Sequence, residues 1–408
     1  MQPTTPSFAD NLRNDKTVGK FVIITGLICL GYYFLELANH RAQMADFRVY
    51  YDAANAFIHD TQLYGKAFGV SSGFYKYSPF ACIPFIPLAV LPYSVASFIY
   101  YLIIVAAICW FMVKLFDEIH PNTNWKSGHK GWALFFVALF MADHLERELH
   151  LGNVNLFLLI MAFAIFDFLR KNKNKSAGIL FGMLLLFKPH FLILIPYFIW
   201  KKKWTTLFAS AGSVLVGILL PTLIKGYQGN IQLHAEWLVA MKDHNVKLEE
   251  SPNTMYGIVN HFLLNHHGGL WLIGLLLLVT AGLFALFLLR NKRVEKNEDI
   301  RFSEYFLLIA LIPNLTHTDT EHFMWSWPLI AYVIISLITT QIRHKQYYII
   351  VMFLAFIPYC VNSPDIVGKQ IRFLFDEGGL LGTANILILI CAVLIALEQS
   401  RKRHLVVA

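Results

Sequence analysis

The sequence predicts an all-α polytopic integral membrane protein. Hydrophobic residues make up 57% of the 408 residues and charged residues only 15%, and the mean hydropathy is +0.53. A chain of this composition cannot bury its apolar surface in one soluble core. Several apolar runs also approach the roughly 20 residues that a helix needs to cross a bilayer. These runs are Phe21 to Ala38, Ser94 to Phe116, Thr205 to Ile224, Leu270 to Leu289 and Leu381 to Leu397.

The basic residues predict the topology of these helices. Lys and Arg gather in short loops, which the positive-inside rule places in the cytoplasm together with both termini. Termini on one side require an even number of crossings, and the apolar segments supply about twelve. We read the first run as a retained anchor, because it follows a polar stretch and has no small-residue cleavage site. The basic clusters are Arg170 to Lys175, Lys201 to Lys203, Arg290 to Arg301 and Arg401 to Arg403.

The two largest outer loops are expected at residues 39–78 and 225–268. Within the first, Val49, Ala53 and Phe57 recur at helical spacing, which predicts an amphipathic helix lying in the membrane interface. The sequence shows no internal repeat, so we expect one membrane domain over residues 1–408. Each of the five cysteines stands alone inside an apolar run, which favours a structural role. The net charge of +8 is explained by topology, so nucleic acid is not an expected partner.

Two short apolar stretches contain breaks. Phe80 to Leu91 carries Pro84 and Pro87, which favours a juxtamembrane or re-entrant piece. Lys188-Pro189 interrupts the run between Gly178 and Trp200, and proline ends a helix because it lacks an amide donor. We therefore expect helices there that stop partway through the membrane and line a cavity.

An acid follows the first apolar run. Asp46 lies just past its end, before the expected amphipathic helix. A carboxylate in this place can act as a general base at the lipid interface. It can equally cap the helix, because Asp commonly satisfies free amide groups at a helix start. For Asp52, on the polar face of the same helix, a solvated position is the better interpretation.

Three further polar clusters are expected on the outer side. Lys188 and His190 lie between apolar half-segments, and a desolvated cation needs an anionic partner such as phosphate or a structural carboxylate. Arg147 and His150 belong to a second cluster, which runs into Gly152-Asn153-Val154-Asn155. There Arg147 can clamp a phosphate, and the asparagines can bind a sugar or join helices. Asn253, in a polar turn, can bind sugar hydroxyls or merely start a helix.

The third cluster is the short turn from Thr316 to His322, which holds two histidines and two acids. We favour binding of a phosphate or sugar by His322. Metal binding and simple surface polarity are the alternatives, but the order of ligands matches no helical metal motif.

These features together resemble glycosyltransferase family 87, the polyprenyl-phosphate-mannose-dependent enzymes with an integral-membrane GT-C fold. The resemblance covers most of the chain and is carried by short motifs whose order matters more than any one of them. They are Asp46-Phe47-Arg48-Val49-Tyr50, Leu63-Tyr64-Gly65, Tyr77-Ser78-Pro79 with Pro87-Leu88, Gly152-Asn153-Val154-Asn155, and Gly182 through Lys188-Pro189. The asparagine at position 153 departs from the glutamine that the family tends to show.

The resemblance implies an enzyme of the inner (plasma) membrane with its active site on the outer face. It would move a sugar, by family default mannose, from a polyprenyl phosphate to a glycolipid or glycan, with inversion and with Asp46 as general base. The lipid phosphate is a good leaving group, so we expect no metal and no cofactor. The donor phosphate and sugar are expected to contact Lys188, His322, Arg147, His150 and His190. The acceptor or the sugar is expected to contact Tyr50, Asn153, Asn253, Asp319 and Glu321.

Two alternatives to this function remain. Broken helices with buried Lys, His and Asp also describe the pathway of a secondary transporter for a polar or anionic solute. Transporters usually show two related halves, and this sequence shows none. The second alternative is a non-catalytic membrane partner in the assembly of envelope polysaccharide.

Overall fold

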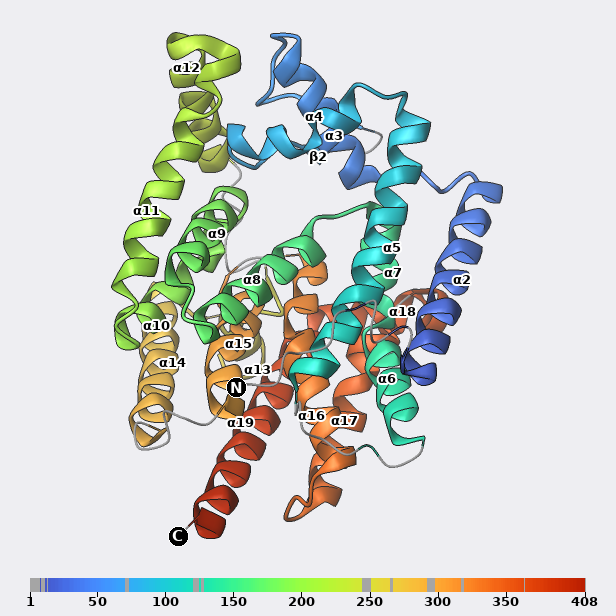
Figure 1. Ribbon diagram of the computed structural model, residues 1–408, viewed down its shortest axis with the longest axis vertical. Coiled ribbons are helices and arrows are strands. Elements are labelled where there is room, and N and C mark those ends of the chain that lie inside the picture. Colours follow the sequence, from blue (N-terminus) through green and yellow to red (C-terminus); the bar gives the residue numbers. More distant parts are fainter. Residues whose placement is uncertain are drawn as a thin grey trace. The chain divides into compact units, whose positions relative to one another are not determined.

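The computed structural model shows a protein built of helices (Figure 1). It describes residues 8, 12, 14–69, 73–119, 125, 128–243, 251–264, 267–291, 298–316, 319–362 and 364–407. Within these residues the only strands are β1 (Ala67–Phe68) and β2 (Gly73–Phe74), which pair antiparallel. The chain divides into two compact units, each made of segments distant in sequence. Unit 1 comprises residues 1–24, 110–145 and 246–408, and unit 2 comprises residues 25–109 and 146–245. The expectation of one membrane domain stays a prediction.

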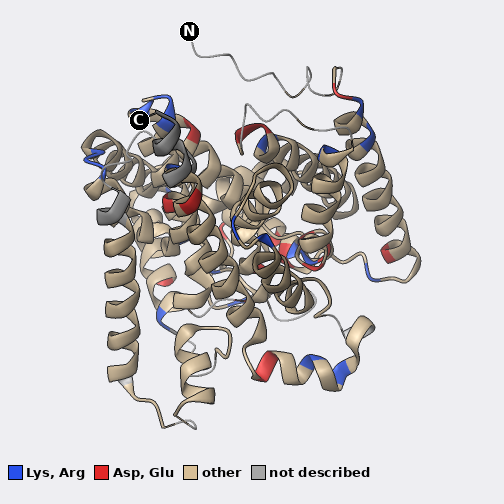
Figure 2. Cartoon of the chain, turned by 90° about the horizontal axis from the view of Figure 1, so that it is seen from below, with Lys and Arg blue, Asp and Glu red and all other residues tan. Residues whose placement is uncertain are grey.

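The prediction of an all-α membrane protein is confirmed by the length and hydropathy of the helices. In the described part of the chain, four helical segments are long and apolar enough to cross a bilayer. Two further pairs of helices meet this criterion only when the two helices of a pair are counted together, and each pair is bent at its break. Figure 2 shows that most of the ribbon carries neither acids nor bases. The number of about twelve crossings stays a prediction. The four segments are Lys16–Ala38, Tyr93–Glu118, Thr320–Thr339 and Leu380–Ser400.

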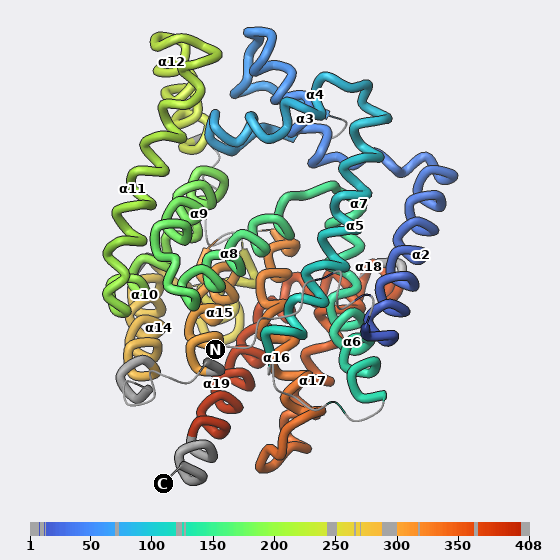
Figure 3. Tube along the Cα trace, viewed as in Figure 1, coloured from blue at the N-terminus to red at the C-terminus, as the bar shows by residue number. Residues whose placement is uncertain are grey.

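The two bent pairs are α7 (Ala142–Leu151) with α8 (Asn155–Arg170), and α11 (Trp204–Leu219) with α12 (Thr222–Asp243). Their axes turn by 116° and 90°, and Figure 3 follows the path of the chain through both bends. The apolar run from Thr205 to Ile224 is therefore not one straight helix, and its crossing of the membrane stays a prediction. Pro221 lies at the break, where its ring removes a helical hydrogen bond. The loop expected at 225–268 contains most of α12 and all of α13 (Met255–Phe262).

Unit 2 begins with the last part of α2 (Lys16–Ala38) and then forms α3 (Ala45–Ile58). Seven of the 14 residues of α3 are buried, which confirms the amphipathic helix expected in the first outer loop. After the two strands, the chain forms the 3-10 helix η1 (Pro79–Phe85) and the short α4 (Ile86–Ala89) before α5 (Tyr93–Glu118). The break expected between Phe80 and Leu91 is thus present.

The later part of unit 2 contains the half-segments expected around Lys188. Helix α9 (Asn174–Phe187) stops at Lys188, and η2 (Pro189–Leu194) and α10 (Ile195–Trp200) return the chain. Helices α9 and α11 pack side by side in the same direction. A Cβ on Gly178 would lie 2.3 Å from the carbonyl oxygen of Thr206, and one on Gly182 would lie 2.6 Å from that of Ser210. Small residues thus allow the two backbones to approach closely.

Unit 1 contains α6 (His129–Phe140) and a bundle of helices from the C-terminal half of the chain. Its centre holds a polar network around Asn385, which is fully buried. The side-chain oxygen of Asn385 accepts hydrogen bonds of 2.6 Å from Ser326 and Tyr359, and its amide donates to Asn314. A satisfied network of this kind fixes how helices pack in an apolar environment. The bundle comprises α14 (Leu270–Asn291), α15 (Glu298–Leu315), η5 (Thr320–Ser326), α16 (Trp327–Thr339), α17 (Lys345–Cys360), α18 (Pro364–Glu377) and α19 (Leu380–Val407).

Candidate functional site

The candidate site lies in unit 2, where the first turn of α3 meets the loop between α7 and α8. Helix α3 begins at Ala45, and Met44 occupies the N-cap position without a side-chain capping bond. Asp46 is therefore the second residue of the helix and not its N-cap, so that alternative interpretation was wrong. As an acid in the first turn, Asp46 gains from the positive end of the helix dipole.

The loop packs against this turn because residue 152 is a glycine. Gly152 has φ of +67°, in the left-handed region that ends many helices. Its backbone N–H donates to the carbonyl of Glu148 at 3.0 Å. A Cβ at this position would lie 2.7 Å from the Cβ of Phe47 and 2.8 Å from the Cε of Met44. The close approach sets Asn153 beside the start of α3.

Asn153 connects the acid to a tyrosine. Its amide nitrogen Nδ2 donates a hydrogen bond of 2.6 Å to Oδ2 of Asp46. Its oxygen Oδ1 accepts from the hydroxyl of Tyr50 at 3.3 Å and from the backbone N–H of Val154 at 2.7 Å. The hydroxyl of Tyr100 also donates to the Asn153 carbonyl, at 3.2 Å. These bonds fix the orientation of the amide, so that its N–H points at the carboxylate.

The same loop also binds the ammonium group of Lys188. Asn155, the first residue of α8, is fully buried, and its Oδ1 accepts a hydrogen bond of 2.8 Å from the ammonium of Lys188. Lys188 is 8% exposed, and its Nζ lies 5.9 Å from the centre of the Tyr77 ring. The hydroxyl of Tyr77 lies 3.3 Å from that of Tyr50. Acid, tyrosines and lysine therefore form one cluster, held by the two asparagines.

The tyrosine in this cluster is a hydrogen-bond donor at neutral pH. Burial raises the pKa of Tyr50 well above its ordinary value, and the neighbouring Tyr77 and the negative charge of Asp46 raise it further. The phenol therefore keeps its proton. Tyr50 can orient a polar group, but it is not set up to act as a base.

A buried acid fixes the start of α8. Glu148 is 0% exposed, and its Oε1 accepts a hydrogen bond of 2.8 Å from the backbone N–H of Leu156. Val154, in the N-cap position, makes no side-chain capping bond. Glu148 thus performs the capping, with its carboxyl group at the positive end of the helix. This contact holds Asn153 and Asn155 at the bend between α7 and α8.

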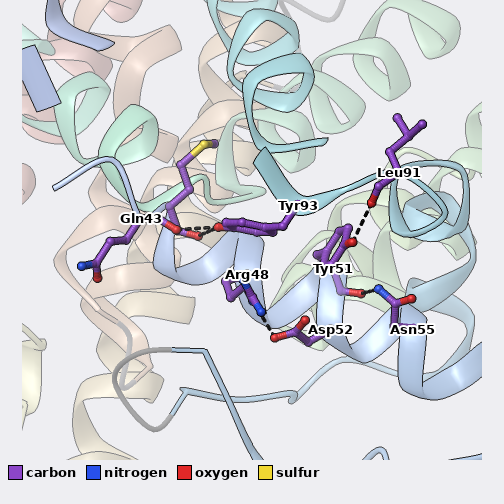
Figure 4. A network of polar contacts seen from close by, with 8 residues as sticks. Gln43, Arg48, Tyr51, Asp52, Asn55, Leu91 and Tyr93 are labelled. Atoms are coloured by element: carbon purple, nitrogen blue, oxygen red, sulfur yellow. Dashed lines mark hydrogen bonds and ion pairs between the residues drawn. The ribbon is translucent and has the colours of Figure 1, made fainter. Parts of the chain in front are cut away.

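The outward side of α3 is anchored separately. Figure 4 shows that Arg48 forms an ion pair with Asp52, with 2.8 Å between Nε and Oδ2. The guanidinium lies 4.3 Å from the centre of the Tyr93 ring. The hydroxyl of Tyr51 donates to the carbonyl of Leu91 at 2.6 Å (Figure 4). Asp52 pairs with Arg48 and is partly exposed, which agrees with the solvated position expected on the polar face.

Three more residues were expected at the donor phosphate. His150 lies on α7, and its Nδ1 lies 2.6 Å from Oε2 of Glu36 at the end of α2. Arg147 is half-buried on α7. His190 is half-buried in η2, two residues beyond Lys188. Their roles in binding stay predictions.

The remaining expected residues lie in unit 1. Asp319 is exposed and precedes η5, whereas Glu321 and His322 are buried. Nδ1 of His322 lies 3.0 Å from the carbonyl oxygen of Asp319. One ligand atom from each of these three residues lies within 4.8 Å of the others, a grouping of donor types that suits a divalent cation. The expectation that no metal is needed is not tested by this geometry and stays a prediction. His317, in the same sequence cluster, lies outside the described residues.

Asn253 also lies in unit 1 and links two segments of the chain. Its Oδ1 accepts from the backbone N–H of Gly382 at 3.0 Å, and its carbonyl accepts from Asn314 at 3.1 Å. Both contacts hold the turn at residues 251–254 against α15 and α19. The expected contact between Asn253 and a sugar stays a prediction.

Three residues in or beside the cluster were not among the expected catalytic or binding residues. Tyr77 and Asn155 stood in the motifs of the resemblance, and their position there was the available signal. Glu148 stood in the run Glu146-Arg147-Glu148, which has the composition of a polar surface. No feature of that run separated the buried acid from its neighbours.

Comparison with known proteins identifies a family. The model of glycosyltransferase family 87 matches residues 74–313. The chain is also 24% identical over 198 residues to an alpha-(1->3)-arabinofuranosyltransferase of Corynebacterium glutamicum. That alignment covers 48% of this chain and 45% of the relative, so the match spans about half the length of either protein. No solved structure matches the chain.

Proposed function

The chain belongs to glycosyltransferase family 87, and we propose that this membrane glycosyltransferase takes its sugar from a polyprenyl-phosphate donor. The acceptor is a glycolipid or glycan of the cell envelope. One observation carries the proposal: a single loop binds a carboxylate through Asn153 and a buried ammonium through Asn155. A base for the acceptor and a cation for a departing phosphate are the two groups that such a transfer needs.

In the proposed mechanism, Asp46 accepts the proton of an acceptor hydroxyl. The hydroxyl oxygen then forms a bond to the anomeric carbon of the sugar, while the bond from that carbon to the lipid-phosphate oxygen breaks. The polyprenyl phosphate leaves with the electron pair, and the configuration at the anomeric carbon inverts. Lys188 stabilises the negative charge that develops on the phosphate. Asn153 keeps the Asp46 carboxylate oriented, and Tyr50 holds Asn153.

The position of the cluster within unit 2 supports an outer-face site. Helix α8 has Asn155 at one end and Arg170 at the other, and 16 helical residues span about 24 Å. Helix α9 likewise has basic residues before it and Lys188 directly after it. If the basic ends face the cytoplasm, the cluster lies toward the opposite leaflet. The roles expected for His322, Asp319, Glu321 and Asn253 stay predictions.

The identity of the transferred sugar is the most specific part of the proposal. The resemblance implies mannose, whereas the relative from C. glutamicum is named for arabinofuranose. The purified protein should therefore be incubated with polyprenyl phosphates that carry mannose, arabinofuranose, glucose or galactose, together with an envelope glycolipid extract. Consumption of one lipid, with release of polyprenyl phosphate and labelling of the acceptor, is the expected result. Consumption of none of them, or transfer only from a nucleotide sugar, would overturn the proposed donor.

A further inference from the structure

An apolar groove runs along unit 2 between α9 and α11. It is an open hollow with a volume of about 820 Å³, and Ile179 and Met183 of α9 form one wall. Phe208, Gly212 and Val216 of α11 form the other wall, at the helical spacing that puts them on one face. Much of the groove surface is apolar, and the absence of a side chain at Gly212 leaves space in it.

The walls of this groove face away from the packed interior. Phe208 is 75% exposed, Val216 62% and Ile179 52%. Both helices are strongly apolar, and α11 belongs to one of the bent pairs that can cross a bilayer. Exposed apolar side chains on such a helix meet lipid tails and not water. A linear hydrocarbon chain is the ligand that fits a groove of this lining.

One end of the groove adjoins the candidate site. Phe80 lines the groove, and its ring lies 6.3 Å from that of Phe187, the residue before Lys188. The hydroxyl of Ser78 donates to the carbonyl of Leu186 at 2.6 Å, which ties η1 to the end of α9. The groove therefore ends next to the residue that precedes Lys188.

The other end of the groove lies by Lys175. This residue is in the first turn of α9, 13 residues before Lys188, which corresponds to about 20 Å along a helix. The groove thus follows α9 from the candidate site toward the basic ends of the helices. Its direction is that of a lipid tail which descends from the site into the membrane.

We propose that the groove between α9 and α11 holds the isoprenoid tail of the lipid-linked donor while the donor phosphate lies at Lys188. This inference rests on the proposed function and adds to it the part of the chain that recognises the lipid. The contact between Phe80 of the groove and Phe187, next to Lys188, favours the donor tail over a phospholipid, whose headgroup would bind at the far end beside Lys175. Donors with longer tails should therefore bind better than donors whose tails are too short to enter the groove.

The test fills the groove without disturbing the packing of the protein. No atom lies within 4 Å of a Cβ built on Gly212, so Gly212→Leu puts its side chain into open space in the groove. Gly282 on α14 has equally open surroundings and provides the matched control Gly282→Leu. Both variants and the wild type are assayed with a full-length polyprenyl donor and with a citronellyl donor that carries the same sugar.

We expect Gly212→Leu to lower kcat/KM for the full-length donor by about tenfold or more, because a leucine displaces buried methylenes of the tail. Its kcat/KM for the citronellyl donor should stay near the wild-type value, and Gly282→Leu should change neither. Equal use of the full-length donor by Gly212→Leu and wild type would overturn the inference, as would an equal loss with both donors.

A second measurement separates the inference from the proposed function. A polyprenyl phosphate with a diazirine in its tail is photo-crosslinked to the wild-type protein, and the labelled peptides are identified. If the label lies in α9 or α11 and unmodified polyprenyl phosphate prevents it, the result supports binding of the tail in the groove, even if no sugar is transferred. Transfer of sugar with competed label only on other helices would overturn the groove while leaving the proposed function intact. Label that an excess of phospholipid removes equally well would show a general lipid groove and would also overturn it.

Discussion

The side-chain amide of Asn153 donates a hydrogen bond of 2.6 Å to the carboxylate of Asp46. This contact joins the first turn of α3 to the bend between α7 and α8, two segments separated by 107 residues in sequence. The amide is itself held by Tyr50 and by the backbone of Val154. An acid with its orientation fixed in this way is preorganised for proton transfer.

Replacing Asn153 by Ala should lower the rate of transfer while leaving the binding of the donor largely unchanged. The carboxylate would lose a partner whose absence costs about 1 to 3 kcal/mol, which corresponds to a loss of about tenfold to a hundredfold in kcat. Measurement of kcat and of the KM for the donor separates the two effects. A rise in the donor KM at constant kcat would contradict an orienting role and point to sugar binding by Asn153.

Gly152→Ala should destabilise the protein more than Gly128→Ala. Both glycines have a positive φ, +67° and +79°, so the backbone strains an alanine at both positions. Only at position 152 would the new Cβ meet other atoms, at 2.7 Å from Phe47. We expect an additional loss of about 1 to 3 kcal/mol there, seen as a lower midpoint of thermal unfolding in detergent. Equal midpoints for the two variants would show that the loop does not pack tightly against α3.

Lys188→Met should weaken donor use strongly, because it removes the cation proposed for the departing phosphate. A hydrogen bond to a charged group contributes about 1.5 to 3 kcal/mol, so kcat/KM for the donor should fall by about tenfold or more. Lys202→Met provides a control, since Lys202 is exposed in the turn after α10. If both variants retain the activity of the wild type, Lys188 has a structural role only.

Removal of divalent cations should leave sugar transfer intact, because phosphate is already a good leaving group and Lys188 supplies a positive charge. Protein treated with EDTA and then assayed with and without added Mg²⁺, Mn²⁺ or Zn²⁺ tests this expectation. The three ligand atoms of Asp319, Glu321 and His322, which lie within 4.8 Å of one another, are the first candidates if activity is lost. Loss on chelation that a cation restores in wild type, but not in His322→Ala, would identify a metal centre.

Patterns in short stretches of sequence predicted where individual helices form and end. The spacing of Val49, Ala53 and Phe57 predicted α3, whose inward face is buried. Lys188-Pro189 predicted the end of α9. The bend at Pro221 was missed, because proline is tolerated within membrane helices and the apolar run continues past it. Composition could not separate a kinked span from a sharp break.

The candidate site was predictable only in part. Motif order brought Asp46, Tyr50, Asn153 and Lys188 into one expected site, and these residues lie in one cluster of unit 2. Their contacts depend on the close packing of Gly152 against Phe47, which is a tertiary feature. The pairing of His150 with Glu36 depends on which face of α7 meets α2, and residue types alone do not give that face.

The central claim is that Asp46 is the general base, and the most direct test compares Asp46→Asn with Asp52→Asn. Both changes remove one negative charge from α3, but Asp52 pairs with Arg48 on the polar face while Asp46 lies in the cluster. Transfer from the full-length donor is measured on variants that insert into the membrane and unfold like the wild type. We predict a loss of about 10² to 10⁴ in kcat for Asp46→Asn and a change of no more than a few fold for Asp52→Asn. Full transfer by Asp46→Asn would contradict the account.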